Sequence, residues 1–301
     1  MTNSNDYNFR EAQKKAQRKS QLELGITRAQ EPDRNFEKGG RSFYFFDLDD
    51  NVFFLGTPIY VFHKKTNAEI ALSSGDFAKH LSEIGKSGIY KDYIIDPTDT
   101  LGSFRRFRDE DKPVNLRSFC EDLQTAIAKP EFDWKGPSWQ CFYHAAFNQR
   151  PMSLITARGH APETIKEGIK LFVRDGHLPF EPNYLSLYPV SHPETQNQLT
   201  GGKMMSTAEL KLRAVIESVE MAMKTYGINP HHRFGMSDDD PKNLELIYKA
   251  MLILKHKYPD NSFFVIHTHE SDYVKEEVFL NHTERHTLTQ SQLQLDLSQP
   301  G

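Results

Sequence analysis

The stretch SFYFFDLDDN at positions 42–51 is a run of apolar residues that ends in the carboxylates Asp47, Asp49 and Asp50. Its apolar part is continuous rather than alternating, which is typical of a strand that is covered on both faces. Three carboxylates so close together repel one another unless a cation lies among them, and Mg²⁺ prefers clustered oxygen ligands. The stretch therefore predicts a buried strand with a divalent cation site at its end. The alternative is a solvated acidic turn.

Four further apolar runs of strand length follow, at 152–157, 183–190, 232–237 and 262–269. The segments between them have apolar residues at helical spacing and helix-capping residues at their ends, at 161–176, 206–227 and 240–260. Strands that alternate with helices imply right-handed crossovers, so we expect an α/β fold with a parallel, doubly wound sheet. Ligands bind at the carboxyl ends of the strands in such sheets.

The regular alternation is interrupted once, between the first and second runs. The interruption has its own pattern, with a hairpin that turns at Thr66 and Asn67 and two helix-like segments, 114–128 and 137–148. Both ends of the chain are polar, and a basic helix over 8–24 that touches RNA or an acidic partner is an alternative to a plain soluble tail. We expect a flexible arm at 1–41, a core formed by 42–52 and 151–280, an inserted lobe at 53–150 and a flexible tail at 281–301.

The composition narrows the class of protein. The chain has 301 residues, of which 26% are charged and 38% hydrophobic, and a formal net charge of -4, so it is long enough for a large core. That charge gives no general reason to expect nucleic-acid binding, and no apolar run is long enough to cross a bilayer, so we expect a cytoplasmic protein without membrane contact. Cys120 and Cys141 lack the spacing of a zinc site and are interpreted as buried thiols.

Polar residues also end two of the later runs. Thr156 and Ala157 end the second run, and Asp238, Asp239 and Asp240 end the fourth. Lys211 lies on the helix that leads to the fourth run, 27 residues before Asp238. If the sheet forms as expected, these groups and the first acidic cluster converge at one edge of it.

This order of motifs resembles the haloacid dehalogenase (HAD) superfamily, most members of which are phosphohydrolases with a Rossmann-like core. The resemblance rests on Asp47-Leu48-Asp49 after an apolar strand, on SLIT ending in Thr156, on a Lys at a helix and on FGMSDDD ending in acidic residues. It spans residues 43–240. It implies a HAD-like Rossmannoid core and makes the insertion after the first strand a C1-type cap lobe.

The resemblance also implies roles for single residues. Asp47 would be the nucleophile that forms an aspartyl-phosphate, and Asp49 would act as general acid and base. Mg²⁺ would be held by Asp47, the Asp49 backbone carbonyl, Asp238 and Asp239. Thr156, Ala157 and Lys211 would bind the phosphoryl oxygens. The function implied is hydrolysis of a phosphate monoester, with a small phosphorylated molecule as substrate and nucleic acid as an unsupported alternative.

The chain departs from the family pattern at three places. Asn51 stands where Thr or Val is usual, so a side-chain amide would hold the turn after the nucleophile. Lys203 is a rival of Lys211 for the active-site lysine, although Lys211 has the more usual spacing. The remote acid of the fourth motif is replaced by Asn243 or supplied by Asp239, which leaves the third protein ligand of the metal open.

For several residues, a structural role explains the sequence as well as a functional role does. Arg158 and His160 could contact substrate or belong to the start of a surface helix. His267 and His269 have metal-like spacing on a strand, but two histidines without a third ligand are usually structural. A core is favoured over a substrate pocket for the aromatic group Trp134, Trp139, Phe142 and Tyr143. A HAD-like binding or scaffold protein that recognises a macromolecule is the alternative to an enzyme.

Overall fold

The computed structural model describes residues 29–98, 100–269, 272–280 and 287–289. The chain divides into two compact units, Met1–Pro32 and Asp33–Gly301, and all the described helices and strands lie in the second. Among the helices that the structure describes, none combines the length and the hydrophobicity of a segment that spans a bilayer.

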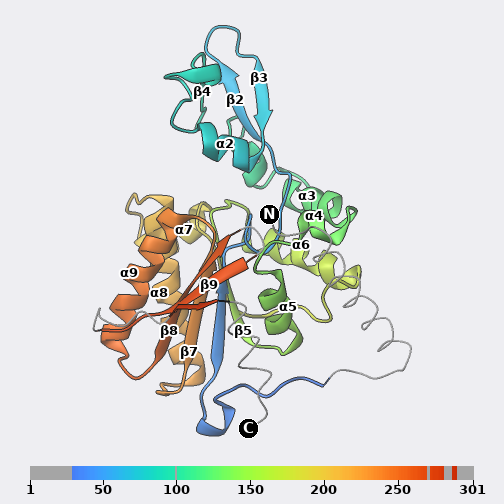
Figure 1. Cartoon of the computed structure of the whole chain (residues 1–301). Coiled ribbons are helices and arrows are strands. Elements are labelled where there is room, and N and C mark those ends of the chain that lie inside the picture. Colours follow the sequence, from blue (N-terminus) through green and yellow to red (C-terminus); the bar gives the residue numbers. More distant parts are fainter. Residues whose placement is uncertain (1–28, 99, 270–271, 281–286, 290–301) are drawn as a thin grey trace. The chain divides into compact units, whose positions relative to one another are not determined.

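A seven-stranded sheet with the order β10-β9-β8-β7-β1-β5-β6 forms the centre of the second unit (Figure 1). The five consecutive strands from β8 to the edge strand β6 are parallel, as the five apolar runs predict: β1 (Ser42–Phe46), β5 (Pro151–Thr156), β6 (Asn183–Pro189), β7 (Arg233–Asp238) and β8 (Ser262–His269). At the other end of the sheet, β9 (Asp272–Glu277) and the edge strand β10 (Thr287–Thr289) are antiparallel and were not expected. The chain leaves β1 in one direction for β5 and β6 and in the other for β7 and β8, so the topological switch point lies at β1.

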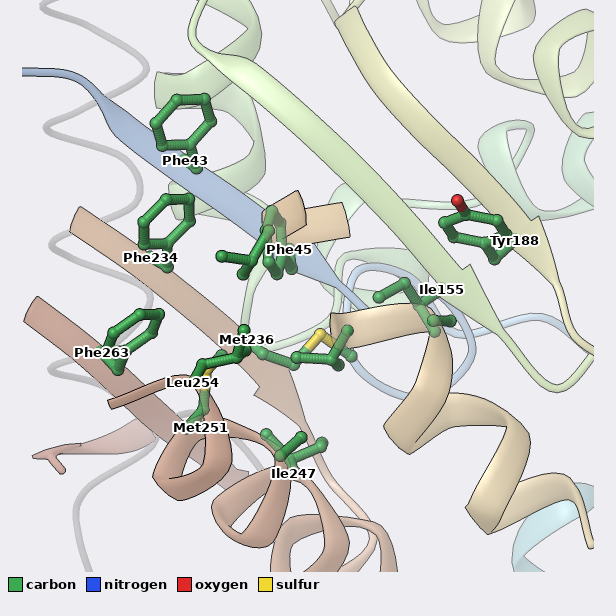
Figure 2. Close-up of a cluster of buried hydrophobic side chains, with 14 of the residues drawn as sticks. Phe43, Phe45, Ile155, Tyr188, Phe234, Met236, Ile247, Met251, Leu254 and Phe263 are labelled. Atoms are coloured by element: carbon green, nitrogen blue, oxygen red, sulfur yellow. The ribbon is translucent and has the colours of Figure 1, made fainter. Parts of the chain in front are cut away.

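Helices cover both faces of this sheet, as expected for a doubly wound fold (Figure 1). On one face lie α8 (Thr207–Tyr226) and α9 (Pro241–Lys257), and on the other α3 (Ser118–Ile127), α5 (Trp139–Phe147) and α6 (Pro162–Arg174). Alternate residues of β1 serve the two cores, because Phe43 and Phe45 pack in the first cluster and Phe46 in the second. Figure 2 shows the first cluster, in which Phe234 stacks on Phe43 at 4.7 Å and on Phe263 at 5.3 Å.

The inserted segment 53–150 has two differently packed parts. The first is a three-stranded antiparallel sheet, β3-β2-β4, with its own small core of Val61, Leu72 and Ile84. It comprises β2 (Ile59–His63), β3 (Glu69–Leu72), α2 (Ser74–His80), the 3-10 helix η2 (Gly88–Tyr90) and β4 (Tyr93–Ile94), and Asn67 forms the expected hairpin turn with φ 56°.

The second part packs against the central sheet. It contains η3 (Arg105–Phe107), η4 (Val114–Leu116), α3, α4 (Glu131–Trp134) and α5. Trp134, Trp139 and Phe142 are buried with Phe46 of β1, which confirms the core reading of this aromatic group, while Tyr143 is partly buried beside them. Cys120 is buried and Cys141 half-buried, and burial raises the pKa of both thiols to about 11.

The chain ends have more structure than the sequence suggests where they are described. Within the expected arm at 1–41, η1 (Phe36–Lys38) precedes β1, and Asp33 accepts hydrogen bonds from the Ser42 backbone N–H and hydroxyl. Residues 1–28, with the expected basic helix, lie outside the described residues. β10 falls within the expected tail at 281–301, the other residues of which lie outside the description. The helix α7 (Pro193–Thr200), after β6, was also not expected.

Candidate active site

The polar residues at the ends of the first and fourth apolar runs meet because these runs form β1 and β7, which are neighbours in the sheet. Phe46 pairs with Ser237, and the Asp47 N–H donates to the Ser237 carbonyl at 3.0 Å, so the parallel register continues to the end of both strands. Asp47 and Asp238 therefore leave the sheet side by side, at the switch point where α/β folds bind their ligands. Both side chains are buried.

A lysine ammonium lies between these two carboxylates. Lys211 reaches from α8, and its Nζ lies 3.0 Å from Asp47 Oδ2 and 2.9 Å from Asp238 Oδ2. Burial alone would lower the pKa of Lys211, but the two carboxylates raise it above its usual value, so this residue is an ammonium at neutral pH. Its rival Lys203 is exposed in the turn before α8.

Three carboxylates at this edge can converge on one cation. Asp47, Asp238 and Asp239 each offer an oxygen, and these atoms lie within 4.8 Å of one another. Asp47 Oδ1 is buried and has no hydrogen-bond partner, although buried carboxylate oxygens usually have one. Carboxylate oxygens are ligands that Mg²⁺ accepts, and a buried oxygen without a partner is open to a cation, so the residues present are compatible with such an ion.

Burial and neighbouring carboxylates raise the pKa of two aspartates at this edge of the sheet. Burial raises the pKa of the Asp47 carboxyl, and Asp238 and Asp239 raise it further against the opposing effect of Lys211. Burial and the Asp238 and Asp50 charges raise the pKa of Asp239 to about 7. Negative charge is therefore in excess here, and a divalent cation would relieve the repulsion.

Asn243, at the position where the resemblance leads one to expect a remote acid, lies beside Asp238. Its Nδ2 donates to Asp238 Oδ1 at 3.1 Å, and the Asp240 N–H donates to the same oxygen at 3.0 Å. Asn243 thus orients Asp238. Among the described carboxylates, Asp239 is the third member of the group that could hold the cation.

The turn after Asp47 is held by the side-chain amide of Asn51, as expected. Asn51 Nδ2 donates to the Asp47 carbonyl at 3.0 Å and to the Ser237 hydroxyl at 2.9 Å, which joins the ends of β1 and β7. Its Oδ1 accepts hydrogen bonds from Ser138 at 2.7 Å and from Thr268 at 2.9 Å. The side chain is fully buried, so this amide fixes the turn after Asp47 to three other segments of the chain.

The second motif lies at the end of β5, which is the neighbour of β1 on the side opposite β7. Thr156 is the last residue of β5, which pairs with β1, and its buried side chain accepts a hydrogen bond from the Arg158 N–H at 3.3 Å. Ala157 follows it and is exposed. Their expected contact with phosphoryl oxygens stays a prediction.

Asp49 is bound by an arginine and does not belong to the carboxylate group of Asp47. Arg158 Nε donates to Asp49 Oδ2 at 2.8 Å, and Nη2 donates to Oδ1 at 2.7 Å. Arg158 is 0% exposed, so its alternative reading as part of a surface helix start is wrong, and the same holds for the buried His160. The sequence shows an Arg after Thr156, but the pairing joins residues 109 positions apart, and no local pattern predicts it.

No protein-family model, curated protein or solved structure matches this chain. The chemistry of the site is therefore inferred from its own residues. The metal-like spacing of the two histidines in β8 adds no ligand to this site, because His267 belongs to no group of potential metal ligands among the described residues. The side chain of His269 lies outside the description.

His160 provides a test of the packing around Arg158. Burial and the nearby Arg158, Arg117 and Arg106 charges hold the pKa of His160 well below its usual 6.5, and Ser118 lies at 3.1 Å from its Nε2. Below pH 6.5 the unfolded chain therefore binds a proton that the native protein does not, so stability is lost as the pH falls from 6.5 toward the lowered pKa.

We expect wild type to lose about 1 kcal/mol more unfolding free energy than His160→Gln between pH 7.5 and pH 5.5, because one pKa unit corresponds to about 1.4 kcal/mol. Urea unfolding at the two pH values measures this difference. An equal loss in both proteins would contradict the burial of a neutral imidazole.

Proposed function

We propose that this chain is a Mg²⁺-dependent phosphohydrolase of the HAD type that cleaves a phosphate monoester through Asp47. One observation carries the proposal: Asp47 presents a buried, unpartnered oxygen beside Asp238 and Asp239, while Lys211 binds its other oxygen at 3.0 Å. Lys211 fixes the orientation of this carboxylate, and a carboxylate held in one orientation can attack phosphorus as a nucleophile.

The metal would be held by the side chains of Asp47, Asp238 and Asp239 and, as the family resemblance implies, by the Asp49 carbonyl. When bound, Mg²⁺ supplies positive charge that offsets the repulsion between these carboxylates and the phosphate. Lys211 adds a second positive charge at the same place. Phosphoryl transfer depends chiefly on such positioning and charge compensation.

In the first step, an oxygen of Asp47 attacks phosphorus in line, and the bond between phosphorus and the alcohol oxygen breaks. Asp49 donates its proton to the departing alcohol, which leaves an aspartyl-phosphate on Asp47. In the second step, Asp49 takes a proton from water as the water oxygen attacks phosphorus. Inorganic phosphate leaves and Asp47 returns to its carboxylate form, so one water is consumed for each ester cleaved.

The polar groups of the neighbouring strand end would hold the phosphoryl group. Thr156 and the Ala157 N–H lie at the end of β5, beside β1, where a ligand at the switch point would meet them. The insertion at 53–150 would act as a C1-type cap that excludes water and selects the substrate. A lobe of this size favours a small phosphorylated molecule over a protein.

A phosphate-release screen tests the proposal. The purified chain is incubated with sugar phosphates, nucleotides, phosphoserine and phosphorylated oligonucleotides, each with Mg²⁺ or with excess EDTA. We expect release from at least one small phosphate ester with Mg²⁺ and none with EDTA. No release from any ester would count against the enzyme and would favour the alternative of a binding or scaffold protein.

A further inference from the structure

The Asp49–Arg158 ion pair lies at the edge of the site and is held by two hydrogen bonds. The Asp49 side chain is 28% exposed, but both of its oxygens accept hydrogen bonds from Arg158, which is fully buried. The guanidinium lies over the rings of Phe107 and Phe119, with its Cζ 4.8 and 4.9 Å from their centroids. A two-point contact between planar groups fixes orientation as well as distance.

The arginine is itself fixed by a chain of polar contacts in the insertion. Arg158 Nη2 donates to Thr57 Oγ1 at 2.8 Å, and Thr57 donates to Asp122 Oδ2 at 2.7 Å. The other oxygen of Asp122 accepts a hydrogen bond from Arg106 Nη2 at 2.6 Å. Five side chains from four segments thus form one continuous network, of which Asp49 is the end at the site.

Backbone contacts hold the same segments together. The Gly159 N–H donates to the Phe107 carbonyl at 2.8 Å, and the Ser118 hydroxyl donates to the Arg106 carbonyl at 2.9 Å. The turn after Thr156 and the η3 segment of the insertion are therefore docked on each other. A movement of this part of the insertion would move the arginine that holds Asp49.

We propose that Arg158 is a positioning residue that aims the Asp49 carboxyl at the leaving oxygen, with Thr57, Asp122 and Arg106 as its support; this rests on the function proposed above. A carboxyl group has about four lone-pair sites, of which the pair with Arg158 uses two, so a proton can sit on one of the remaining sites of Asp49 and pass from there to the leaving oxygen. A general acid must lie about 2.6–3.2 Å from the atom it protonates, and a misplacement of about 1 Å can cost about 10²-fold in rate.

Two substrates with different leaving groups separate this role from a merely structural one. An alkyl phosphate such as phosphoserine needs its leaving oxygen protonated, whereas the 4-nitrophenolate of 4-nitrophenyl phosphate departs without that help. We expect Arg158→Met to lower kcat/KM, which reports the steps up to departure of the leaving group, by about 10²-fold for phosphoserine and by no more than about threefold for 4-nitrophenyl phosphate.

Further variants still test the positioning role if Arg158→Met folds poorly. Asp122→Asn weakens the support of Arg158 without touching the site, and we expect the same selective loss at a smaller size, about fivefold for phosphoserine. The matched control is Arg174→Met, which breaks the exposed pair of an arginine with Asp175 at the end of α6 and should change neither substrate. In an Asp49→Asn background, Arg158→Met should have no additional effect on phosphoserine.

Three results would overturn the positioning role. An equal loss of kcat/KM on both substrates would mean a structural role, a loss that comes wholly from a higher KM at constant kcat would mean substrate binding, and a wild type that cleaves only 4-nitrophenyl phosphate would mean that Asp49 gives no help to the leaving group. Failure of the proposed function looks different. In that case wild type releases phosphate from neither compound, or Asp47→Asn is as active as wild type.

Discussion

Asp47→Asn should lose phosphate release by about 10⁴-fold or more, since a missing nucleophile removes the pathway that the rest of the site serves. The amide is the same size as the carboxylate but cannot form the acyl phosphate. Burial raises the pKa of Asp47, which means that its charge is costly in the native state. We therefore expect the variant to be as stable as wild type, or more stable, when Mg²⁺ is absent.

Phosphate release and urea unfolding, measured on the same preparation, check both halves of this expectation. The matched control is Asp260→Asn, which makes the same chemical change at an exposed position between α9 and β8 and should leave release unchanged. Release by Asp47→Asn at a rate near that of wild type would remove Asp47 as the nucleophile. A large fall in stability would instead mean that the loss of activity is not informative.

Lys211→Met should have the largest effect on stability. Lys211 is 2% exposed and is bound by Asp47 and Asp238, so its removal leaves two buried carboxylates without their cation. Breaking a buried ion pair on one side typically costs about 3–5 kcal/mol. We expect a loss of unfolding free energy of that size, measured by urea unfolding without Mg²⁺.

Two comparisons show whether the cause is electrostatic. Lys203→Met changes the rival lysine, which is exposed, and should alter stability by no more than about 0.5 kcal/mol. Asp47→Asn combined with Lys211→Met should recover part of the loss, because one of the two unpaired charges is gone. If Lys211→Met and Lys203→Met are equally mild, the buried bridge does not form.

The sequence predicts those features of the fold that depend on local pattern. The five parallel strands are continuous apolar runs because helices cover both faces of the sheet, and Asp47, Thr156 and Asp238 are recognisable as polar groups that end such runs. Lys211 is predicted by its spacing from Asp238 along one helix and one strand. These relations involve a strand and its immediate flank, where periodicity carries information.

Other features depend on contacts between distant segments, and local pattern does not predict them. The pair of Asp49 with Arg158 joins two turns whose proximity follows only from the order of strands in the sheet. The two-part packing of the insertion depends on which of its aromatic residues reach the central core, and β9 has few apolar residues, as expected of a strand near a sheet edge.

The fully buried amide of Asn51 has a consequence for the order in which the turn after Asp47 is assembled. Its oxygen is bound by Ser138 in the middle of the chain and by Thr268 in β8, close to the C-terminal end of the sheet. A nascent chain that has not yet been synthesised past Thr268 therefore lacks one of the groups that shape the turn after Asp47. The turn after Asp47 therefore gains its full set of hydrogen bonds only after β8 has been synthesised.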